Sequence, residues 1–78
     1  MVTIRYFGFA SVTFPGEAEV TPGKNLKEFI ISLLQGQEVD ADFFMDYHLI
    51  VKNGLRMEPD TTIADEDKIY IFPHATIG

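Results

Sequence analysis

Residues 25–36 read NLKEFIISLLQG, and this stretch decides the class of fold. Its apolar side chains recur three and four positions apart, which places them on one stripe of a helix. Asn25 is a good N-cap residue with Glu28 three positions later, as in a capping box, and Gly36 suits the left-handed residue after the last turn. The stretch predicts an amphipathic helix, which must bury its apolar stripe against another layer of structure.

Stretches on both sides of this helix alternate between apolar and polar residues, as half-buried strands do. Two strands precede the helix and are expected to pair as an antiparallel hairpin. Two more flank Asn53-Gly54, a dipeptide that strongly favours the tight turn of a hairpin. The five expected strands are residues 2–7, 17–21, 48–52, 55–57 and 68–72.

Two further segments are less regular. Residues 37–47 surround three consecutive apolar side chains with aspartates, and they form either a short helix or an ordered loop whose aromatic rings close the end of the core. Residues 61–64 are expected to form a single turn before the exposed acidic corner Asp65-Glu66-Asp67.

The order strand, strand, helix, strand, short strand, strand predicts an α+β fold, with a mixed sheet of four to five strands and one main helix packed across it. Because the helix lies between two hairpins, a β-grasp arrangement is expected, with the terminal strands parallel and side by side in the centre. Residues 1–73 form the expected domain, and residues 74–78 a flexible C-terminal tail. The expected core comprises Val2, Ile4, Tyr6, Val20, Leu26, Phe29, Ile30, Leu33, Leu49, Val51, Ile69 and Ile71.

Composition excludes several classes of function. The chain has 78 residues, enough for one small domain, and its twelve acidic and six basic residues give a formal charge of −6. That charge repels a phosphate backbone, so nucleic acid is not an expected partner. No apolar run is long enough to span a membrane, and the N-terminal stretch is not a signal peptide. The absence of cysteine excludes a disulfide scaffold and a thiolate metal site, and it favours a cytoplasmic location.

Side-chain chemistry offers little for catalysis. The two histidines, His48 and His74, lie in separate elements, a strand edge and the tail. Asp40, Asp42 and Asp46 lack the glycine and glutamate that a calcium loop requires, so a solvated acidic face is expected rather than a metal site. The chain is therefore not expected to be an enzyme by itself or to bind a cofactor.

The second half of the chain resembles a known family. Residues 51–54 read VKNG, residues 63–73 read IADEDKIYIFP, and the chain ends on Gly78. With these stretches, the chain resembles the MoaD/ThiS family of ubiquitin-like sulfur carrier proteins over nearly its whole length. The Phe72-Pro73 pair before the tail makes it more similar to MoaD, the small subunit of molybdopterin synthase.

The resemblance implies a ubiquitin-like β-grasp fold and a carrier function. In the family, the C-terminal glycine is adenylated by a ubiquitin-activating-enzyme-like adenylyltransferase that uses ATP, and it is then converted to a thiocarboxylate. The tail enters a synthase large subunit, where the sulfur passes to a pterin precursor. Gly78 is then the reactive residue, and Thr76 and Ile77 form the stalk. Thiamine or another thiolated product is the alternative destination of the sulfur.

The chain departs from the family pattern at two positions. Glu66 stands where the family usually has glycine, and Ile77 replaces the penultimate glycine. A β-branched residue is stiff and bulky in a narrow channel. Either the partner has a wider channel, or the native chain extends further, or the chain is a β-grasp interaction module without covalent chemistry.

Strand alternation predicts a partner-binding surface beside the tail. If Ile69 and Ile71 face the helix, their neighbours along the strand face the other way. Aromatic residues and arginine are enriched at binding hot spots. We therefore expect a larger protein to bind this open face through Arg5, Phe7, Tyr70 and Phe72.

Overall fold

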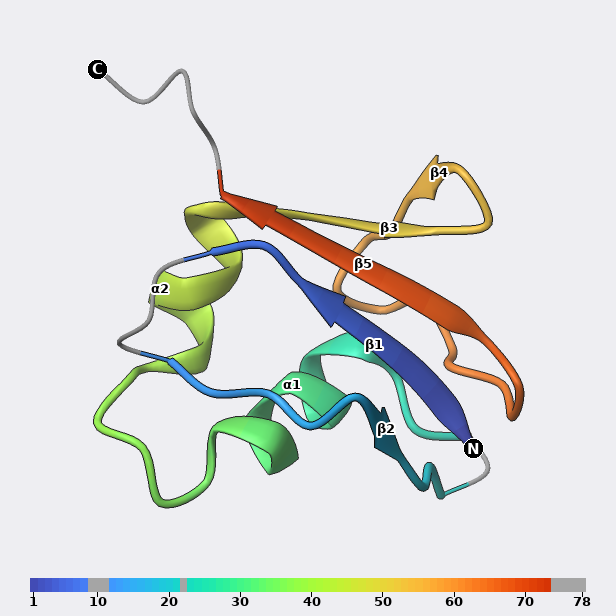
Figure 1. Ribbon diagram of the computed structural model, residues 1–78, viewed down its shortest axis with the longest axis horizontal. Helices are drawn as coiled ribbons and strands as arrows, with labels where there is room; N and C mark the ends of the chain where they lie inside the picture. The colour runs from blue at the N-terminus through green and yellow to red at the C-terminus, as the bar shows by residue number, and fades with distance from the viewer. Residues whose placement is uncertain (9–11, 22, 74–78) are drawn as a thin grey trace.

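The computed structural model describes residues 1–8, 12–21 and 23–73, which form a small α+β fold with a five-stranded mixed sheet and two helices (Figure 1). Both helices contribute to a hydrophobic core on one face of the sheet. The elements are β1 (Val2–Tyr6), β2 (Glu17–Ala18), α1 (Leu26–Leu34), α2 (Ala41–Asp46), β3 (His48–Lys52), β4 (Leu55–Arg56) and β5 (Lys68–Pro73).

Helix α1 begins and ends as its sequence predicts. The Asn25 side chain accepts a hydrogen bond from the Glu28 backbone N–H at 2.8 Å, and the Glu28 carboxylate accepts one from the Asn25 N–H at 3.0 Å. These two bonds complete the capping box and satisfy two N–H groups that a helix start leaves without partners. Gly36, after the last turn, has a φ of +84°, a conformation that glycine adopts without strain.

Residues 37–47 contain a short helix, α2, which decides between the two alternatives for this segment. The Asp40 carboxylate caps its first turn by accepting a hydrogen bond from the Phe43 N–H at 3.0 Å. Phe44 is buried and joins the core, so this helix closes one end of it.

The sheet has the strand order β2-β1-β5-β3-β4. The terminal strands β1 and β5 are parallel neighbours in its centre, and the other pairs are antiparallel (Figure 1). Asn53 and Gly54 join β3 to β4 with φ values of +52° and +81°, the left-handed pair that a two-residue hairpin turn requires. Strand β2 is shorter than expected because Ala18 pairs with Val2, so the chain beyond it runs past the start of β1.

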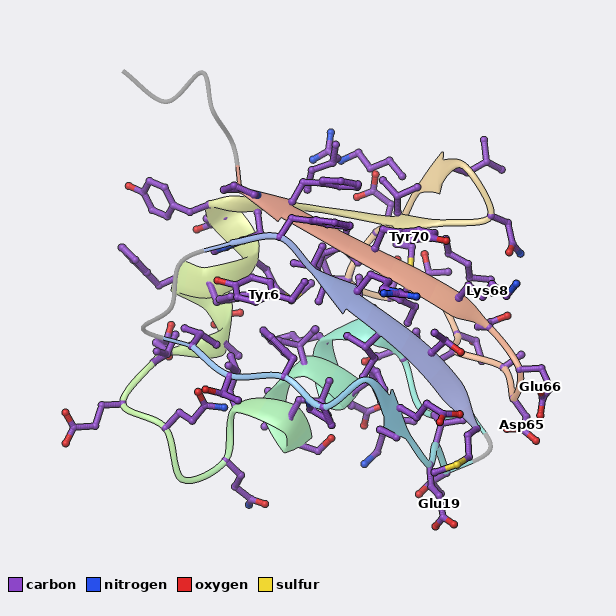
Figure 2. All side chains as sticks on the ribbon, viewed as in Figure 1. Tyr6, Glu19, Asp65, Glu66, Lys68 and Tyr70 are labelled. Carbon is purple, nitrogen blue, oxygen red and sulfur yellow. The ribbon has the colours of Figure 1, made fainter. Side chains whose placement is uncertain are left out.

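Two carboxylates bind the start of β1 to the loop before β5. The α-ammonium group of Met1 forms ion pairs with Asp65 and Glu66, which lie close together at this end of the sheet (Figure 2). Hydrogen bonds to Asp65 and then to Glu66 raise the pKa of the α-amino group, and the bond to the ammonium group lowers the pKa of Asp65. Glu66 has a φ of +69°, so this turn uses a conformation that favours glycine.

The prediction of a turn at residues 61–64 is wrong. The turn lies just before this segment, where the Thr61 N–H donates to the Glu58 carbonyl at 3.0 Å, and the segment itself is extended. It runs beside the start of α1, where the Leu26 N–H donates to the Thr61 carbonyl and the Ile63 N–H donates to the Lys24 carbonyl. These bonds supply partners at the helix start and bury the Ile63 side chain.

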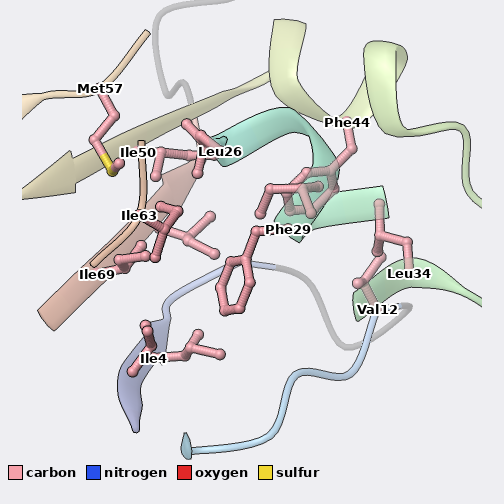
Figure 3. Close-up of a cluster of buried hydrophobic side chains, with 13 residues drawn as sticks. Ile4, Val12, Leu26, Phe29, Leu34, Phe44, Ile50, Met57, Ile63 and Ile69 are labelled. Atoms are coloured by element: carbon pink, nitrogen blue, oxygen red, sulfur yellow. The ribbon is translucent and has the colours of Figure 1, made fainter. Parts of the chain in front are cut away.

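The core corrects the expected orientation of β3. Leu49 and Val51 were expected inside, but the buried residue is Ile50, which lies opposite Ile71 of β5. Paired residues on neighbouring strands share a face, and Ile71 faces the helices, so Ile50 must face them as well. Of the other expected core residues, Tyr6, Val20 and Leu33 are only partly buried. The buried residues are Val2, Ile4, Val12, Leu26, Phe29, Ile30, Leu34, Phe44, Ile50, Met57, Ile63, Ile69 and Ile71 (Figure 3).

Candidate functional site

The face of the sheet turned away from the helices, the open face, carries the four residues predicted to bind a partner. Ile4, Ile69 and Ile71 point into the core, so the residues between them point outward. Arg5 lies opposite Tyr70 on the central parallel pair, and Lys68 and Tyr70 lie two residues apart on the same face of β5 (Figure 2). The structure therefore brings Arg5 and Tyr70 together on this face.

Aromatic rings gather on the open face toward the end of β5. The rings of Phe7 and Phe72 stack with centroids 4.9 Å apart and planes 4° apart, and Tyr70 lies next to Phe72 with centroids 6.4 Å apart. Phe7 keeps 55% of its surface exposed and Phe72 keeps 36%. Large exposed side chains that gather in one place are unusual on a monomeric protein and mark interaction surfaces.

Strand β3 adds two aliphatic residues that the sequence did not assign to this face. Leu49 lies opposite Phe72, and Val51 lies opposite Tyr70, so both share the face of these rings. Both side chains are half-buried. The signal that could have found them is the pairing register of β3 with β5. We call the resulting set the open-face patch, which consists of Phe7, Leu49, Val51, Tyr70 and Phe72.

Pairing also brings basic residues to the borders of the patch. Arg56 lies opposite Val51, and Lys68 lies opposite Thr3. The alternation along β5 is enough to place Lys68 on the same face as Tyr70. Arg56 can be placed on this face only from the pairing register of β3 with β4. Together with Arg5, these two residues form what we call the basic rim: Arg5, Arg56 and Lys68.

The predicted reactive end of the chain lies outside the described residues. This applies to Gly78 and to its stalk, Thr76 and Ile77. The last described residue is Pro73, which ends β5 and lies opposite His48. Because Phe72 directly precedes Pro73, the open-face patch lies next to the point where the tail begins.

His48 belongs to an aromatic cluster at the same end of the sheet. Its ring stacks on Phe44 with centroids 3.9 Å apart, and its Nδ1 lies 2.8 Å from the Phe44 carbonyl oxygen. That oxygen can only accept, so Nδ1 carries the hydrogen. The Tyr6 hydroxyl lies 3.5 Å from Nε2. The half-buried imidazole is thus held by packing, and within the described residues no hydrogen bond links it to a serine or carboxylate side chain as in a catalytic pair.

A cavity of about 280 Å³ lies beside this cluster. Its lining is almost entirely aliphatic and aromatic, with contributions from β1, α2 and the first residue of β3. Besides Tyr6 and His48, the lining residues are Val12, Val39, Phe43, Phe44 and Tyr47. The cavity can hold an apolar group, but the described residues that line it include no carboxylate or ammonium group that would orient a reaction.

Two of the three aspartates in and next to α2, Asp40 and Asp42, have structural roles. Asp40 caps the helix, and Asp42 forms an ion pair with Lys27 at 3.0 Å. Within residues 1–8, 12–21 and 23–73, no three His, Cys, Asp or Glu side chains are grouped so that they could hold a metal ion. Neither helix in this part of the chain has the length and apolar character needed to cross a membrane.

Comparison with known protein families, with curated proteins and with solved structures gave no significant match to this chain.

Proposed function

We propose that the chain is a cytoplasmic sulfur carrier of the MoaD/ThiS type with a β-grasp fold. Gly78, as the C-terminal residue, is the group that is adenylated and converted to a thiocarboxylate. The observation that carries the proposal is the central pair of parallel terminal strands. This pair, in the order β2-β1-β5-β3-β4, is what a β-grasp requires, and it brings the stacked Phe7 and Phe72 to the root of the tail.

The chemistry follows from the properties of a carboxylate. A carboxylate is a poor electrophile because neither oxygen is a leaving group. Adenylation by an ATP-dependent partner releases pyrophosphate and makes one oxygen part of AMP, which a sulfur nucleophile can displace. The product is a thiocarboxylate that carries one sulfur in place of one oxygen. Glycine suits this position because it has no side chain to obstruct a narrow channel.

In this proposal, the open-face patch holds the partner and the tail supplies the reactive group. The five residues after Pro73 can span at most about 17 Å in an extended conformation. A partner docked on Phe72 must therefore have its active site within that distance of the end of β5. This requirement applies both to the adenylyltransferase and to the synthase large subunit, which would use the same face in turn.

The exposed patch also favours a second candidate function, a β-grasp interaction module without covalent chemistry. The stacked Phe7 and Phe72 are present whatever the tail does, and Ile77 is bulkier than the glycine of the family pattern. Among carrier functions, we propose molybdopterin-type cofactor synthesis, with thiamine or another thiolated product as the alternative.

A pyrophosphate exchange assay distinguishes the sulfur carrier from the interaction module without covalent chemistry. The chain is incubated with ATP, labelled pyrophosphate and the adenylyltransferase encoded in the same genome. A carrier supports incorporation of the label into ATP, and a variant that lacks Gly78 does not. The Ile77→Gly variant tests the channel, because removing the β-branched side chain should raise the rate if the channel is narrow. Exchange that is equal with and without Gly78 would leave the interaction module as the function.

A further inference from the structure

We infer that the open face is a positively charged docking surface for a protein surface that carries carboxylates beside an apolar area, although the chain as a whole has a formal charge of −6. The inference rests on the proposed function only in taking the open face as the docking surface. The net charge of −6 alone favours a basic partner. The sign of the charge on the open face itself therefore determines which kind of partner this face can bind.

Half of the basic residues of the chain lie on the open face. The register places Arg5 beside Tyr70, Arg56 opposite Val51 and Lys68 opposite Thr3. Arg5, Arg56 and Lys68 are all exposed. Arg5 and Arg56 lie on either side of the Tyr70–Val51 pair, and Lys68 precedes Tyr70 on β5, so the basic rim borders the half of the open-face patch that lies farther from the end of β5.

Acidic residues are fewer on the same face. Within the five strands, Glu17 is the one acidic residue, and it lies opposite Thr3 at the edge of the sheet. Exposed Glu19 follows β2 on the same side, because Ala18 and Val20 pack against the core, so three basic residues face two acidic ones. The other acidic residues are in the helices, caps and loops. The open face therefore has a positive balance, and the rest of the surface is more negative than the total charge suggests.

The pairing of the basic side chains supports the same conclusion. Away from the open face, Lys27 pairs with Asp42 at 3.0 Å and Lys52 pairs with Asp67 at 2.9 Å. Among the described residues, no ion pair involves a member of the basic rim. In the part of the chain that the structure describes, the rim charges have no ion-pair partner, so they are available to carboxylates of a partner.

These two properties define the partner. The patch needs apolar groups to cover the rings of Phe7 and Phe72, since desolvated aromatic residues supply most of the binding energy at such interfaces. The rim needs carboxylates beside that apolar area, on the side toward the start of β5. Opposite charges at a rim steer association and exclude wrong partners, and a basic surface would be attracted to the helical side instead.

Selection from a library of random peptides tests the inference without a known partner. Peptides displayed on phage are selected on the immobilised full chain, and their affinities are then measured in solution by fluorescence anisotropy. Peptides rich in Asp and Glu together with aliphatic or aromatic residues are expected. Their affinity should fall as NaCl rises from about 0.05 to 0.5 M, because salt screens exposed charges.

Two variants with the same change in net charge provide the control. Arg56→Glu reverses a charge in the basic rim, and Lys24→Glu reverses one in the segment before α1, outside the sheet. We expect Arg56→Glu to weaken binding about fivefold or more, and Lys24→Glu to change it less than about twofold. Circular dichroism of both variants verifies that they are folded.

Three results would overturn the inference: selected peptides rich in Lys and Arg, equal effects of the two variants, or no selection above an uncoated surface. Self-association of the chain that Arg56→Glu abolishes, without peptide binding, would assign the face to a second copy instead. The proposed carrier function is tested independently of this inference. Pyrophosphate exchange depends on Gly78, and its result does not depend on the composition of the selected peptides.

Discussion

Two neighbouring residues of β3 test the orientation of this strand by the same chemical change. Ile50 is 3% exposed and packs in the core, whereas Leu49 is half-buried on the open face. Ile50→Ala removes buried groups and leaves a cavity, which costs about 2–5 kcal/mol. Leu49→Ala removes groups that are still partly in water, so we expect a loss of about 1 kcal/mol or less.

The difference is large for a domain of this size. At about 0.05–0.15 kcal/mol per residue, the whole chain has a free energy of unfolding of about 4–12 kcal/mol. Ile50→Ala should therefore shift the urea midpoint strongly, and Leu49→Ala only slightly. Circular dichroism at a series of urea concentrations measures both midpoints, and equal slopes verify that the two unfolding transitions are comparable. A loss for Leu49→Ala as large as that for Ile50→Ala would refute the assigned orientation of β3.

Three further changes test the partner surface, the helix cap and the N-terminal ion pair. Phe72→Ala should weaken partner binding by more than about 1 kcal/mol without unfolding the chain, whereas Leu55→Ala, which removes a 73% exposed side chain from β4, should leave binding unchanged. A calorimetric titration in which both variants bind alike would argue against the patch. Asn25→Ala should lower the free energy of unfolding by about 1 kcal/mol through loss of the cap, as measured by urea denaturation, and an unaltered midpoint would contradict that role. Because its pKa in the folded chain is lowered from 3.8, Asp65 stabilises the fold above that pH, and this stabilisation is lost as pH falls through the folded pKa. The α-amino group, with a pKa raised from 8.0, stabilises the fold below pH 8 and loses this effect as pH rises through its folded pKa. Thermal unfolding of Asp65→Asn across pH should show weaker losses at both ends, and a profile identical to that of the unchanged chain would contradict the ion pair.

The elements with strong local signals could be predicted from the sequence. Helix α1 has its capping residues and apolar stripe within one stretch, and Asn53-Gly54 fixes the turn between β3 and β4 by its backbone preference. Alternation in the terminal strands was sufficient to place Arg5 and Phe72 on one face. These features depend on residues that are close in the sequence.

The order of elements predicted that β1 and β5 are parallel neighbours, but the exact register of distant strands could not be predicted. Residues 49–51 are all apolar, so alternation cannot say which side of β3 is buried, and the pairing of Ile50 with Ile71 decides it. The same pairing determines that Val51, and through it Arg56, lies on the open face. Residues 61–64 are extended because the start of α1 needs hydrogen-bond acceptors, which no local pattern reveals.

Intact-mass spectrometry tests the central claim, a thiocarboxylate at Gly78, most directly. The chain is incubated with ATP, the adenylyltransferase encoded in the same genome and a sulfur source, after this enzyme has passed a positive control with a carrier known to be its substrate. The account predicts a gain of about 16 Da, from exchange of one oxygen for sulfur, confined on fragmentation to the peptide that ends at Gly78. An unchanged mass while the control carrier gains sulfur would contradict it.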